Sequence, residues 1–339
     1  MNPELLRQEK LTGMIQEFLP SQPIFKSMLP IETDLGDTVT WDIEKEERKL
    51  TGFQGDGSPA QPLALSGIGQ KTAKLGKIFI SETLKGGILN QLRKLGSEQD
   101  DLAAKGRVLA AEKSLAGYID RTEEFLAASA LQGSITTTVD GLAVDAIDYG
   151  IPTGTNVFTY NNGTAAINCG DWADPSTNIL EALEKMVSAA EDVSGYTVKN
   201  AFVSGTVMQY LLNNEKVIEL LRGTSEGVGM LEQNRITKIG DLILRRANRK
   251  YRNASGVLTR YLPEKVVVLC PEPSTDWGSM RYGSDLVPND AGDGFKDQMG
   301  RYSYSEIKKN PVGVTLYGGV RLLPVIKKAG ALIKATVAA

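Results

Sequence analysis

Alternating polar and apolar residues indicate that the segment from 36 to 83 is a long β-hairpin. Residues 38–44 change from polar to apolar at every position, which is the period of a half-buried strand. Six charged residues follow at 44–49, and the glycines and prolines between 52 and 62 favour a turn region. Residues 76–81 are predicted to be the returning strand.

This hairpin carries too little apolar mass to form a core of its own. A two-stranded ribbon alone is marginally stable in water, so we expect it to lie on another surface. A second copy of the chain is the natural candidate. The residues expected at that contact are Val39, Trp41, Ile43, Phe53, Pro59, Pro62, Leu63, Ile78 and Phe79.

A long helix is predicted from about 97 to 131. Ser97 followed by acidic residues is a helix start signal, and Gly133 ends the pattern. A helix of this length would be a rod of roughly 50 Å, longer than the usual globular helix. The apolar stripe expected to pack against the body consists of Leu102, Leu109, Leu115, Ile119 and Leu126.

The segments before and after these two elements predict an arm and a loop. Residues 1–35 form the arm, with a short helix from 3 to about 18, after which prolines favour an extended chain. A Thr-rich strand is expected at 134–139. Residues 149–170, rich in Gly, Asn and Thr, predict a loop.

The second half alternates helical and strand patterns, which favours an α/β or α+β body. Helices are expected at about 174–193 and 206–221, and strands at about 198–203, 242–244, 265–269 and within 312–337. Between the second helix and the next strand, residues 223–229 predict a flexible loop. Its marker residues are Gly223, Ser225, Gly227 and Gly229.

Composition indicates an ordinary globular protein without a strong electrostatic preference. The 339 residues are 41% hydrophobic and 23% charged, with a net charge of −3 and a pI near 5.4. A protein that grips DNA mainly through its phosphates usually has a basic excess, which is absent from these totals. The longest fully apolar run, 266–270, is far too short to span a membrane, and no signal-peptide pattern is present. We therefore expect a soluble protein made in a cytoplasm.

The chain contains no histidine. Histidine is the commonest general base and a common metal ligand, so its absence excludes Ser-His-Asp and Cys-His catalysis and most transition-metal sites. Cys169 and Cys270 have no partner pattern and are expected to be buried, reduced thiols. No cofactor or metal site is predicted.

The short motifs that suggest chemistry lack their required context. Residues 223–227 match the G-x-S-x-G string of a nucleophile elbow, but that mechanism needs a histidine. The carboxylates at 289–297 do not have the ligand register of an EF-hand loop, so a solvated loop is favoured. Basic residues at 245–252 could touch nucleic acid, although a strand turn with a solvated face is the simpler interpretation. No catalytic residue is predicted.

The order of arm, hairpin, long helix, Thr-rich strand, α/β body and closing strands resembles the major capsid proteins of tailed bacteriophages. The resemblance is carried by residues 131–138 (LQGSITTT), 267–271 (VVLCP), 277–283 (WGSMRYG) and the span from Asn310 to Pro324. The chain is most similar to the lambda-type E family, whose subunits have the Hong Kong 97-type fold. The resemblance covers nearly the whole chain.

This resemblance implies an α+β fold and a structural rather than enzymatic role. The implied domains are an arm at 1–35, an extended hairpin loop at 36–83, a peripheral domain with a spine helix at 84–173, an axial domain at 174–258, and return strands, mainly peripheral, at 259–339. Hexamers and pentamers of the subunit would build an icosahedral shell around packaged double-stranded DNA.

The resemblance also implies partners and a location. These are other copies of the chain, a separate scaffolding protein, a portal and, as a further candidate, a decoration protein. DNA would be enclosed without sequence-specific binding and without a membrane. The protein would be part of the virion and would assemble in the host cytoplasm.

Two kinds of alternative remain open at this stage. The same fold could build an encapsulin-like compartment or a gene-transfer particle, which the contents of the shell would distinguish. From a different class, the chain could be a histidine-free hydrolase or a carbohydrate-binding surface protein. A native mass near a megadalton or above would exclude that second class.

Overall fold

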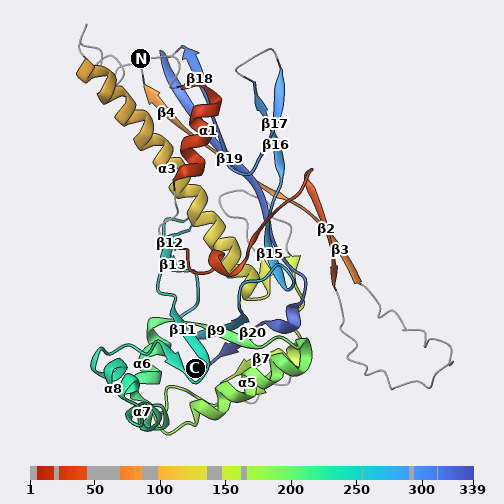
Figure 1. Ribbon diagram of the computed structural model, residues 1–339, viewed down its shortest axis with the longest axis vertical. Coiled ribbons are helices and arrows are strands. Elements are labelled where there is room, and N and C mark those ends of the chain that lie inside the picture. The colour runs from red at the N-terminus through yellow and green to blue at the C-terminus, as the bar shows by residue number, and fades with distance from the viewer. Residues whose placement is uncertain are drawn as a thin grey trace, which may run out of the picture.

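The computed structural model shows an elongated subunit with two bodies, one at each end (Figure 1). An upper body contains the N-terminus and the long helix, and a lower body contains the C-terminus. Each has its own hydrophobic core. The residues described are 6–18, 23–43, 69–85, 98–135, 147–161, 166–253, 255–289, 294–310 and 312–339; side chains are not described for 43 and 98–105.

The upper body is built on a five-stranded sheet centred on the longest strand, β19. β18 pairs with one edge of β19, while β4 and β15 pair antiparallel with different stretches of it, and β1 continues the sheet in parallel with β15. The strands are β1 (Ile31–Thr33), β4 (Gly76–Lys85), β15 (Gly278–Tyr282), β18 (Tyr302–Lys309) and β19 (Val312–Ile326).

Two helices cover one face of this sheet: α1 (Gln8–Glu17) and α3 (Glu98–Leu131). They approach closely because β19 has a glycine where they cross. A Cβ on Gly318 would lie 3.2 Å from Ile15 of α1 and 3.3 Å from Leu115 of α3. The short 3₁₀ turn η2 (Lys26–Met28) leads from the arm to β1. The predicted arm helix and long helix are both confirmed.

Among the described residues, the lower body contains a seven-stranded mixed sheet with four longer helices gathered around it and the one-turn helix α4 (Thr153–Asn156) beside β7 and β8. The sheet order is β10 (Lys238–Ile239), β11 (Leu242–Arg246), β9 (Val198–Val203), β14 (Val266–Pro271), β20 (Ile333–Thr336), β7 (Val157–Thr159) and β8 (Ile167–Asn168). The helices are α5 (Ile179–Ser194), α6 (Gly205–Asn213), α7 (Glu215–Arg222) and α8 (Ser225–Glu232). The 3₁₀ turn η3 (Ala329–Ala331) precedes β20 and contacts α5.

Three sequence predictions for this body need correction. The predicted loop at 149–170 contains α4 (Thr153–Asn156) and two strands of the sheet, because β7 pairs with the distant β20. The single helix predicted at 206–221 is two helices, since Asn214 interrupts it and caps α7. The sheet also includes β7, β8, β14 and β20, which lie outside residues 174–258. The boundaries predicted for the axial domain, 174 and 258, therefore do not coincide with those of the lower body.

Within the described ranges, four hairpins extend from or connect the two bodies. In order, they are β2 (Thr38–Ile43) with β3 (Gly69–Lys74), β5 (Ser134–Ile135) with β6 (Ile147–Asp148), β12 (Lys250–Arg252) with β13 (Leu258–Arg260), and β16 (Ser284–Pro288) with β17 (Phe295–Met299). The strands β15 to β18 were not predicted individually; β15 pairs with the distant β1 and β19, whereas β16 pairs with β17 and β18 with β19, their neighbours along the chain.

The hairpin predicted at 36–83 is present, but its returning strand was misplaced. β2 pairs antiparallel with β3, in the register Thr38 opposite Lys74. Residues 76–81 belong instead to β4, which turns away at Leu75 and joins the main sheet. The consecutive apolar residues Ile78, Phe79 and Ile80 favour a strand but do not determine which strand they pair with. Residues 44–68, which include the predicted tip, lie outside the described residues.

Candidate functional site

The β2–β3 hairpin stands out from the side of the upper body, and its base is firmly anchored (Figure 1). Val39 and Trp41 are buried in the upper core, with Leu75 at the end of the ribbon beside them. The Leu75 amide donates a hydrogen bond to the Asp37 carbonyl oxygen at 2.7 Å. Contacts within the subunit's own core therefore fix the direction in which the hairpin leaves the body.

The opposite face of the same hairpin is polar. Thr40 and Thr72 lie across the ladder with their hydroxyl oxygens 3.0 Å apart, and both residues are exposed. Asp42 and Gln70 form the next cross-strand pair on this face. The hairpin thus presents a hydrogen-bonding surface to its surroundings and keeps its apolar face against its own subunit.

The predicted contact residues therefore divide into three groups. Val39, Trp41 and Ile78 are buried within this chain, so the expectation that they face a neighbour is wrong; they anchor the hairpin and β4. Phe79 is 44% exposed and remains available. The Ile43 side chain, Phe53, Pro59, Pro62 and Leu63 lie outside what the structure describes.

Phe79 belongs to a row of stacked aromatic rings on the sheet face turned away from α3. Its ring centroid lies 5.5 Å from that of Tyr317, which in turn lies 4.9 Å from that of Tyr304. Strand alternation puts these rings opposite Gly318, the residue that meets the helices. The sheet thus has one helix-covered face and one partly open aromatic face.

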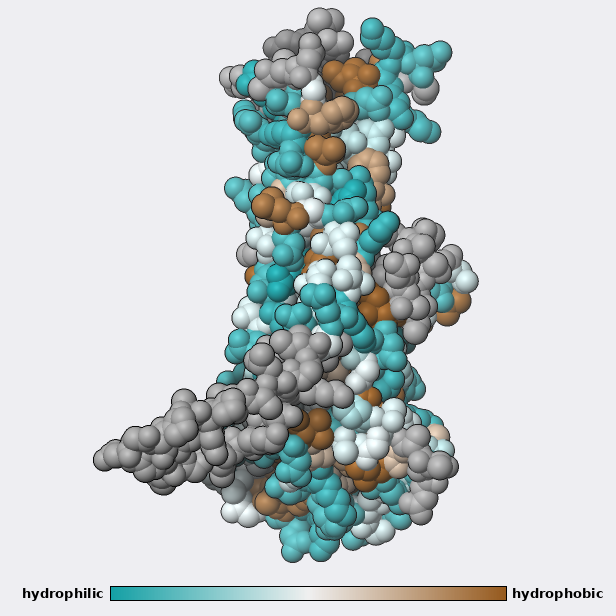
Figure 2. Space-filling model, turned by 90° about the vertical axis from the view of Figure 1, so that its right-hand side faces the viewer, coloured by the Kyte–Doolittle hydropathy of each residue, from teal (hydrophilic) through white to brown (hydrophobic). Residues whose placement is uncertain are grey.

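Elsewhere, exposed apolar side chains are scattered. On the side of the molecule shown in Figure 2, hydrophobic residues form separate small patches among hydrophilic ones. Leu286 and Phe295 are 63% and 73% exposed and lie on one face of the β16–β17 ribbon. Contacts made by projecting ribbons fit this surface better than one broad apolar interface.

A buried ionic cluster joins three remote parts of the upper body. The Arg301 guanidinium donates to Asp120 and to Glu123, which it meets at 2.6 Å, and Lys26 of the arm meets the same Glu123 carboxylate at 2.5 Å. Glu123 is fully buried. Burial alone would raise its pKa, but Lys26 and Arg301 outweigh that effect and hold the pKa below its usual range.

Glu124, the next residue of α3, holds the arm through backbone hydrogen bonds. Its carboxylate accepts the amide hydrogens of Ile24, Phe25 and Lys26 at 2.8, 2.9 and 3.1 Å. Three donors on one carboxylate fix the start of η2 against the helix. Together with the Glu123 cluster, this attaches the N-terminal segment to the long helix.

Glu112 is a buried carboxyl group held by a neutral partner. One oxygen accepts a hydrogen bond from the Ser303 hydroxyl of β18 at 2.8 Å, and the other has no partner among the described residues. Burial, with a smaller contribution from Glu82 of β4, raises the pKa of Glu112 to about 7. It lies beneath α1, whose Thr12 hydroxyl donates to the Ser303 carbonyl.

These acidic residues were missed from the sequence although a signal was available. Leu115, Ile119 and Leu126 of the predicted stripe are buried, as expected. Glu112 and Glu123 lie at helical spacing from Ile119 and so occupy the same buried face. Leu109 is 46% exposed, so its place in the stripe is wrong, and the Leu102 side chain is not among those described.

A second charged cluster forms under the β16–β17 hairpin. Asp285 is buried and forms ion pairs with Lys77 of β4 at 2.6 Å and Arg321 of β19 at 3.1 Å. It also accepts a hydrogen bond from the Tyr302 hydroxyl. Burial raises the pKa of Asp285, but the hydrogen bonds from Lys77 and Tyr302 outweigh it and the pKa is lowered. This cluster ties the hairpin to the main sheet.

The predicted flexible loop at 223–229 is mostly helical. The Thr224 hydroxyl accepts the Gly227 amide and begins α8, which contains Ser225, Gly227 and Gly229. A Cβ on Gly227 would lie 2.2 Å from the Leu221 carbonyl oxygen, so this glycine allows α8 to pack tightly against α7. Gly223 is the residue that ends α7.

Several expectations about chemistry can be compared with the structure. Cys169 and Cys270 are buried and free, as predicted. Within the described ranges, no cluster of three or more His, Cys, Asp or Glu residues is arranged to hold a metal ion. None of the helices in those ranges is long and apolar enough to cross a membrane.

Comparisons with known proteins give a consistent result. The family model described as phage major capsid protein E matches residues 8–337. A protein assigned as a prophage capsid protein of Escherichia coli CFT073 is similar in structure, with a TM-score of 0.66 at 18% identity over 98% of this chain and 99% of that chain. A phage-related protein from Bordetella bronchiseptica RB50 has a TM-score of 0.60 at 10% identity, over 98% and 97%. The capsid of cyanophage P-SCSP1u has a TM-score of 0.52 at 13% identity, over 95% and 90%. No curated protein sequence was found to match.

Proposed function

This chain belongs to the phage major capsid protein E family, and from that premise we propose that it builds the hexamers and pentamers of an icosahedral shell around double-stranded DNA. The fold is of the Hong Kong 97 type. Membership in the family makes the protein a shell-forming, structural component of a virion. The absence of enzymatic activity is part of the proposal.

The observation that best supports this function is the anchored, projecting β2–β3 hairpin. Its apolar face is used within the subunit, and its polar face points outward. Shells need contacts that differ on the two sides of one subunit, and a ribbon on one side supplies such asymmetry. Each contact can be weak because many of them act together.

The two bodies suggest how the subunit is oriented in a capsomer. We assign the lower body to the axial position around the five- and six-fold centres, and the upper body with α3 to the periphery. The hairpin would then lie over a neighbouring subunit. A scaffolding protein, a portal and a decoration protein are the further partners proposed, with assembly in the host cytoplasm.

Particle sizing tests the shell directly. We expect full-length protein, produced with its scaffolding protein, to form particles of a megadalton or more by light scattering and electron microscopy. Monomers alone at high concentration would contradict the proposal. Nuclease-resistant DNA inside particles from infected cells is expected, whereas a cargo enzyme would indicate an encapsulin-like compartment instead.

Deleting residues 53–63 tests the hairpin. The deletion lies outside the described elements, so the two cores and the β2–β3 base should still fold, as circular dichroism and thermal unfolding would report. Assembly should be abolished. A variant that forms normal shells would show that the hairpin is not required. If the deletion variant does not fold, Thr40→Glu with Thr72→Lys is used instead, because this cross-strand pair of opposite charges alters the exposed face without repulsion between the strands.

A further inference from the structure

One short segment of the chain has the opposite electrostatic character to the rest. Residues 242–263 contain six Lys and Arg residues and no Asp or Glu. The rest of the chain contains the other 32 of the 38 basic residues and all 41 acidic residues. The net charge of −3 therefore hides a concentrated basic region.

The fold attaches this segment to the long helix. The β12–β13 hairpin packs on α3 through Tyr251, whose ring centroid lies 5.0 Å from that of Phe125 and 5.1 Å from that of Tyr261. The Tyr261 hydroxyl donates to the Arg121 carbonyl oxygen of α3 at 3.4 Å. Arg260 of the hairpin is paired with Glu264 at 2.8 Å, so Lys250 and Arg252 are the hairpin cations that add to Arg121 of the helix.

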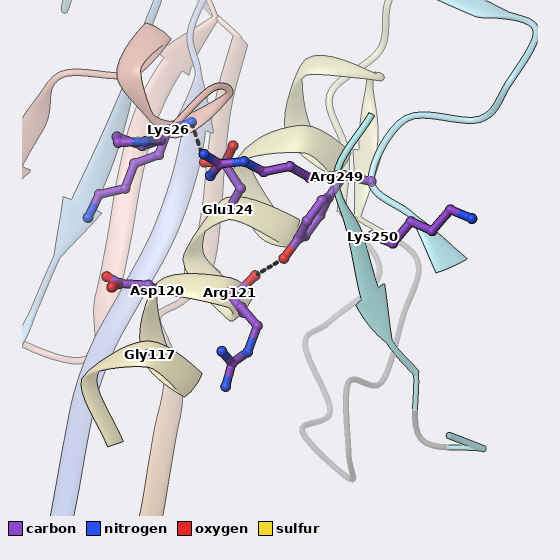
Figure 3. A pocket seen from close by; sticks show the side chains of 9 residues that line it. Lys26, Gly117, Asp120, Arg121, Glu124, Arg249 and Lys250 are labelled. Atoms are coloured by element: carbon purple, nitrogen blue, oxygen red, sulfur yellow. Dashed lines mark hydrogen bonds between the residues drawn. The ribbon is translucent and has the colours of Figure 1, made fainter. Parts of the chain in front are cut away.

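A cleft of about 350 Å³ opens where the hairpin, the arm and α3 meet (Figure 3). Four of its lining residues are cations and two are acids. The lining residues are Pro23, Lys26, Gly117, Asp120, Arg121, Glu124, Arg249, Lys250 and Tyr261. They come from three segments far apart in the sequence.

The two acids of the cleft are already occupied by internal partners. Asp120 receives Arg301, and Glu124 accepts three backbone amides and has the Arg249 side chain extending toward it (Figure 3). Arg121 and Lys250 are both exposed and point away from these carboxylates. The positive charge at the mouth of the cleft is therefore available to an external anion.

We propose that this cleft and the adjoining basic hairpin bind phosphate groups of the enclosed DNA backbone, which makes this flank of α3 the inner face of the shell. The inference rests on the proposed DNA-enclosing function. Lys and Arg side chains on phosphates bind without regard to base sequence. A basic patch on an otherwise acidic subunit would hold the DNA at defined points while the remaining surface repels it.

Salt-dependent binding of a fluorescent DNA duplex to full-length, unassembled subunits tests the site. Arg121→Gln with Lys250→Gln should weaken binding and reduce the slope of log K against log salt by about two, because each of the two cations neutralises one phosphate. The matched control, Lys216→Gln with Lys238→Gln, removes the same charge from exposed positions of the lower body and should leave binding unchanged. Equal binding by the two double variants would overturn the proposal.

A competition experiment separates DNA from free phosphate. Unlabelled duplex should displace the labelled duplex at a much lower total phosphate concentration than inorganic phosphate does, because neighbouring phosphates of one strand bind together. Equal displacement per phosphate would identify a small-anion site and overturn the DNA assignment. Shell formation is scored separately by particle size, so failure of the proposed function is distinguishable from failure of this inference.

Labelling tests the orientation. Both native cysteines are buried, so Lys250→Cys introduces one accessible thiol. A polyethylene-glycol maleimide too large for the shell pores should label free subunits rapidly and intact shells only after they are opened. Equally rapid labelling of intact shells would overturn the inner-face assignment.

Discussion

The upper and lower bodies of the subunit bury polar groups of different kinds. In the upper body the buried set includes charged side chains: Glu112, Glu123, Glu124, Asp285 and Arg301. In the lower body, as far as its residues are described, the buried polar side chains are neutral: Asn156, Ser194, Asn200, Ser204 and Asn214. The contrast follows from how each body is put together.

The lower body uses neutral polar groups, both at helix ends and between distant segments, where Asn156 donates to the Gly330 and Leu332 carbonyl oxygens and Asn200 donates to the Pro271 carbonyl oxygen. Ser204 and Asn214 accept amide hydrogens three residues later and begin α6 and α7, so each satisfies a helix end that would otherwise be unpaired. The core around them is apolar. Such a body depends on packing and on caps worth about 1 kcal/mol each.

The upper body uses charges to join remote segments. Lys26 and Glu123 are 97 residues apart in sequence, and Arg301 and Glu123 are 178 apart. A single sheet with one long helix is a thin structure, and the arm and the β2–β3 hairpin complete its core with buried side chains such as Leu11, Phe25 and Trp41. Paired charges define where those segments attach, at a desolvation cost that makes each cluster sensitive to the removal of one partner.

Breaking the ionic cluster should have the largest effect. Arg301→Met leaves the buried Glu123 with only Lys26 and removes the partner of Asp120. Removing one partner from a buried pair costs about 3–5 kcal/mol. We expect a large fall in the free energy of unfolding, measured by urea denaturation, and a change in near-ultraviolet circular dichroism from the upper body.

The control for this variant is an ion pair of the lower body. Lys185 meets Glu181 at 2.6 Å, but both side chains are more than half exposed, so Lys185→Met should leave stability unchanged. If Arg301→Met also leaves stability unchanged, the buried charges are not what holds the upper body together.

Neutralising Glu112 should give the next largest effect, and it should depend on pH. The pKa of Glu112 is about 7 in the folded subunit and 4.5 in a model peptide, so the folded state binds more protons between these values. The stability that this group contributes is therefore fully present below about pH 4.5 and disappears as pH rises to about 7. The total decrease has an upper limit of about 3 kcal/mol.

Glu112→Gln removes this titration and keeps an oxygen that can accept the Ser303 hydroxyl hydrogen. The variant should be more stable than the parent at pH 8 and similar to it at pH 4.5, as thermal unfolding across pH would measure. Glu184→Gln, at an exposed position of α5, is the lower-body control and should not change the profile. A parent profile that is flat from pH 4.5 to 8 would contradict the assignment.

A third prediction tests packing in the lower body. Gly227→Ala puts a methyl group against the Leu221 backbone and should cost about 1–3 kcal/mol, because neither helix can move without disturbing its neighbours. Gly229→Ala is the matched control in the same helix. Its Cβ meets nothing within 4 Å, so it should be neutral or gain up to about 1 kcal/mol. Equal effects of the two substitutions would show that α7 and α8 are not tightly packed.

The same contrast explains which elements the sequence could predict. The helix predicted at 97–131 is observed at Glu98–Leu131, because its start and stop signals, Ser97 and Gly133, are local, and the strand predicted at 198–203 is observed as β9. The end of α5 at Gly195 was predictable because glycine commonly ends helices in the left-handed conformation, and Gly195 adopts a φ of 73°. These features depend on neighbours within a few positions.

Features that depend on distant partners were not predictable in the same way. The short strand β7 exists because β20, near the other end of the chain, pairs with it. Residues 76–81 were correctly predicted as a strand, but only β19 determines which sheet they join. Glu123 occupies a helical position suited to leucine. Its two cationic partners are Lys26 of the arm and Arg301, which directly precedes β18. The charge pairs of the upper body are long-range by nature.

The smallest predicted effect concerns a lower-body cap. Thr224→Ala removes the hydroxyl that accepts the Gly227 amide at 3.1 Å and should cost about 1 kcal/mol. Because this hydroxyl does not titrate, the cost should be the same at pH 5 and pH 8, unlike that at Glu112. Thr224→Ser keeps the acceptor and should restore most of the stability in the same thermal-unfolding measurement. A pH-dependent cost at Thr224, or no recovery with serine, would mean that the lower body is not held by local neutral caps.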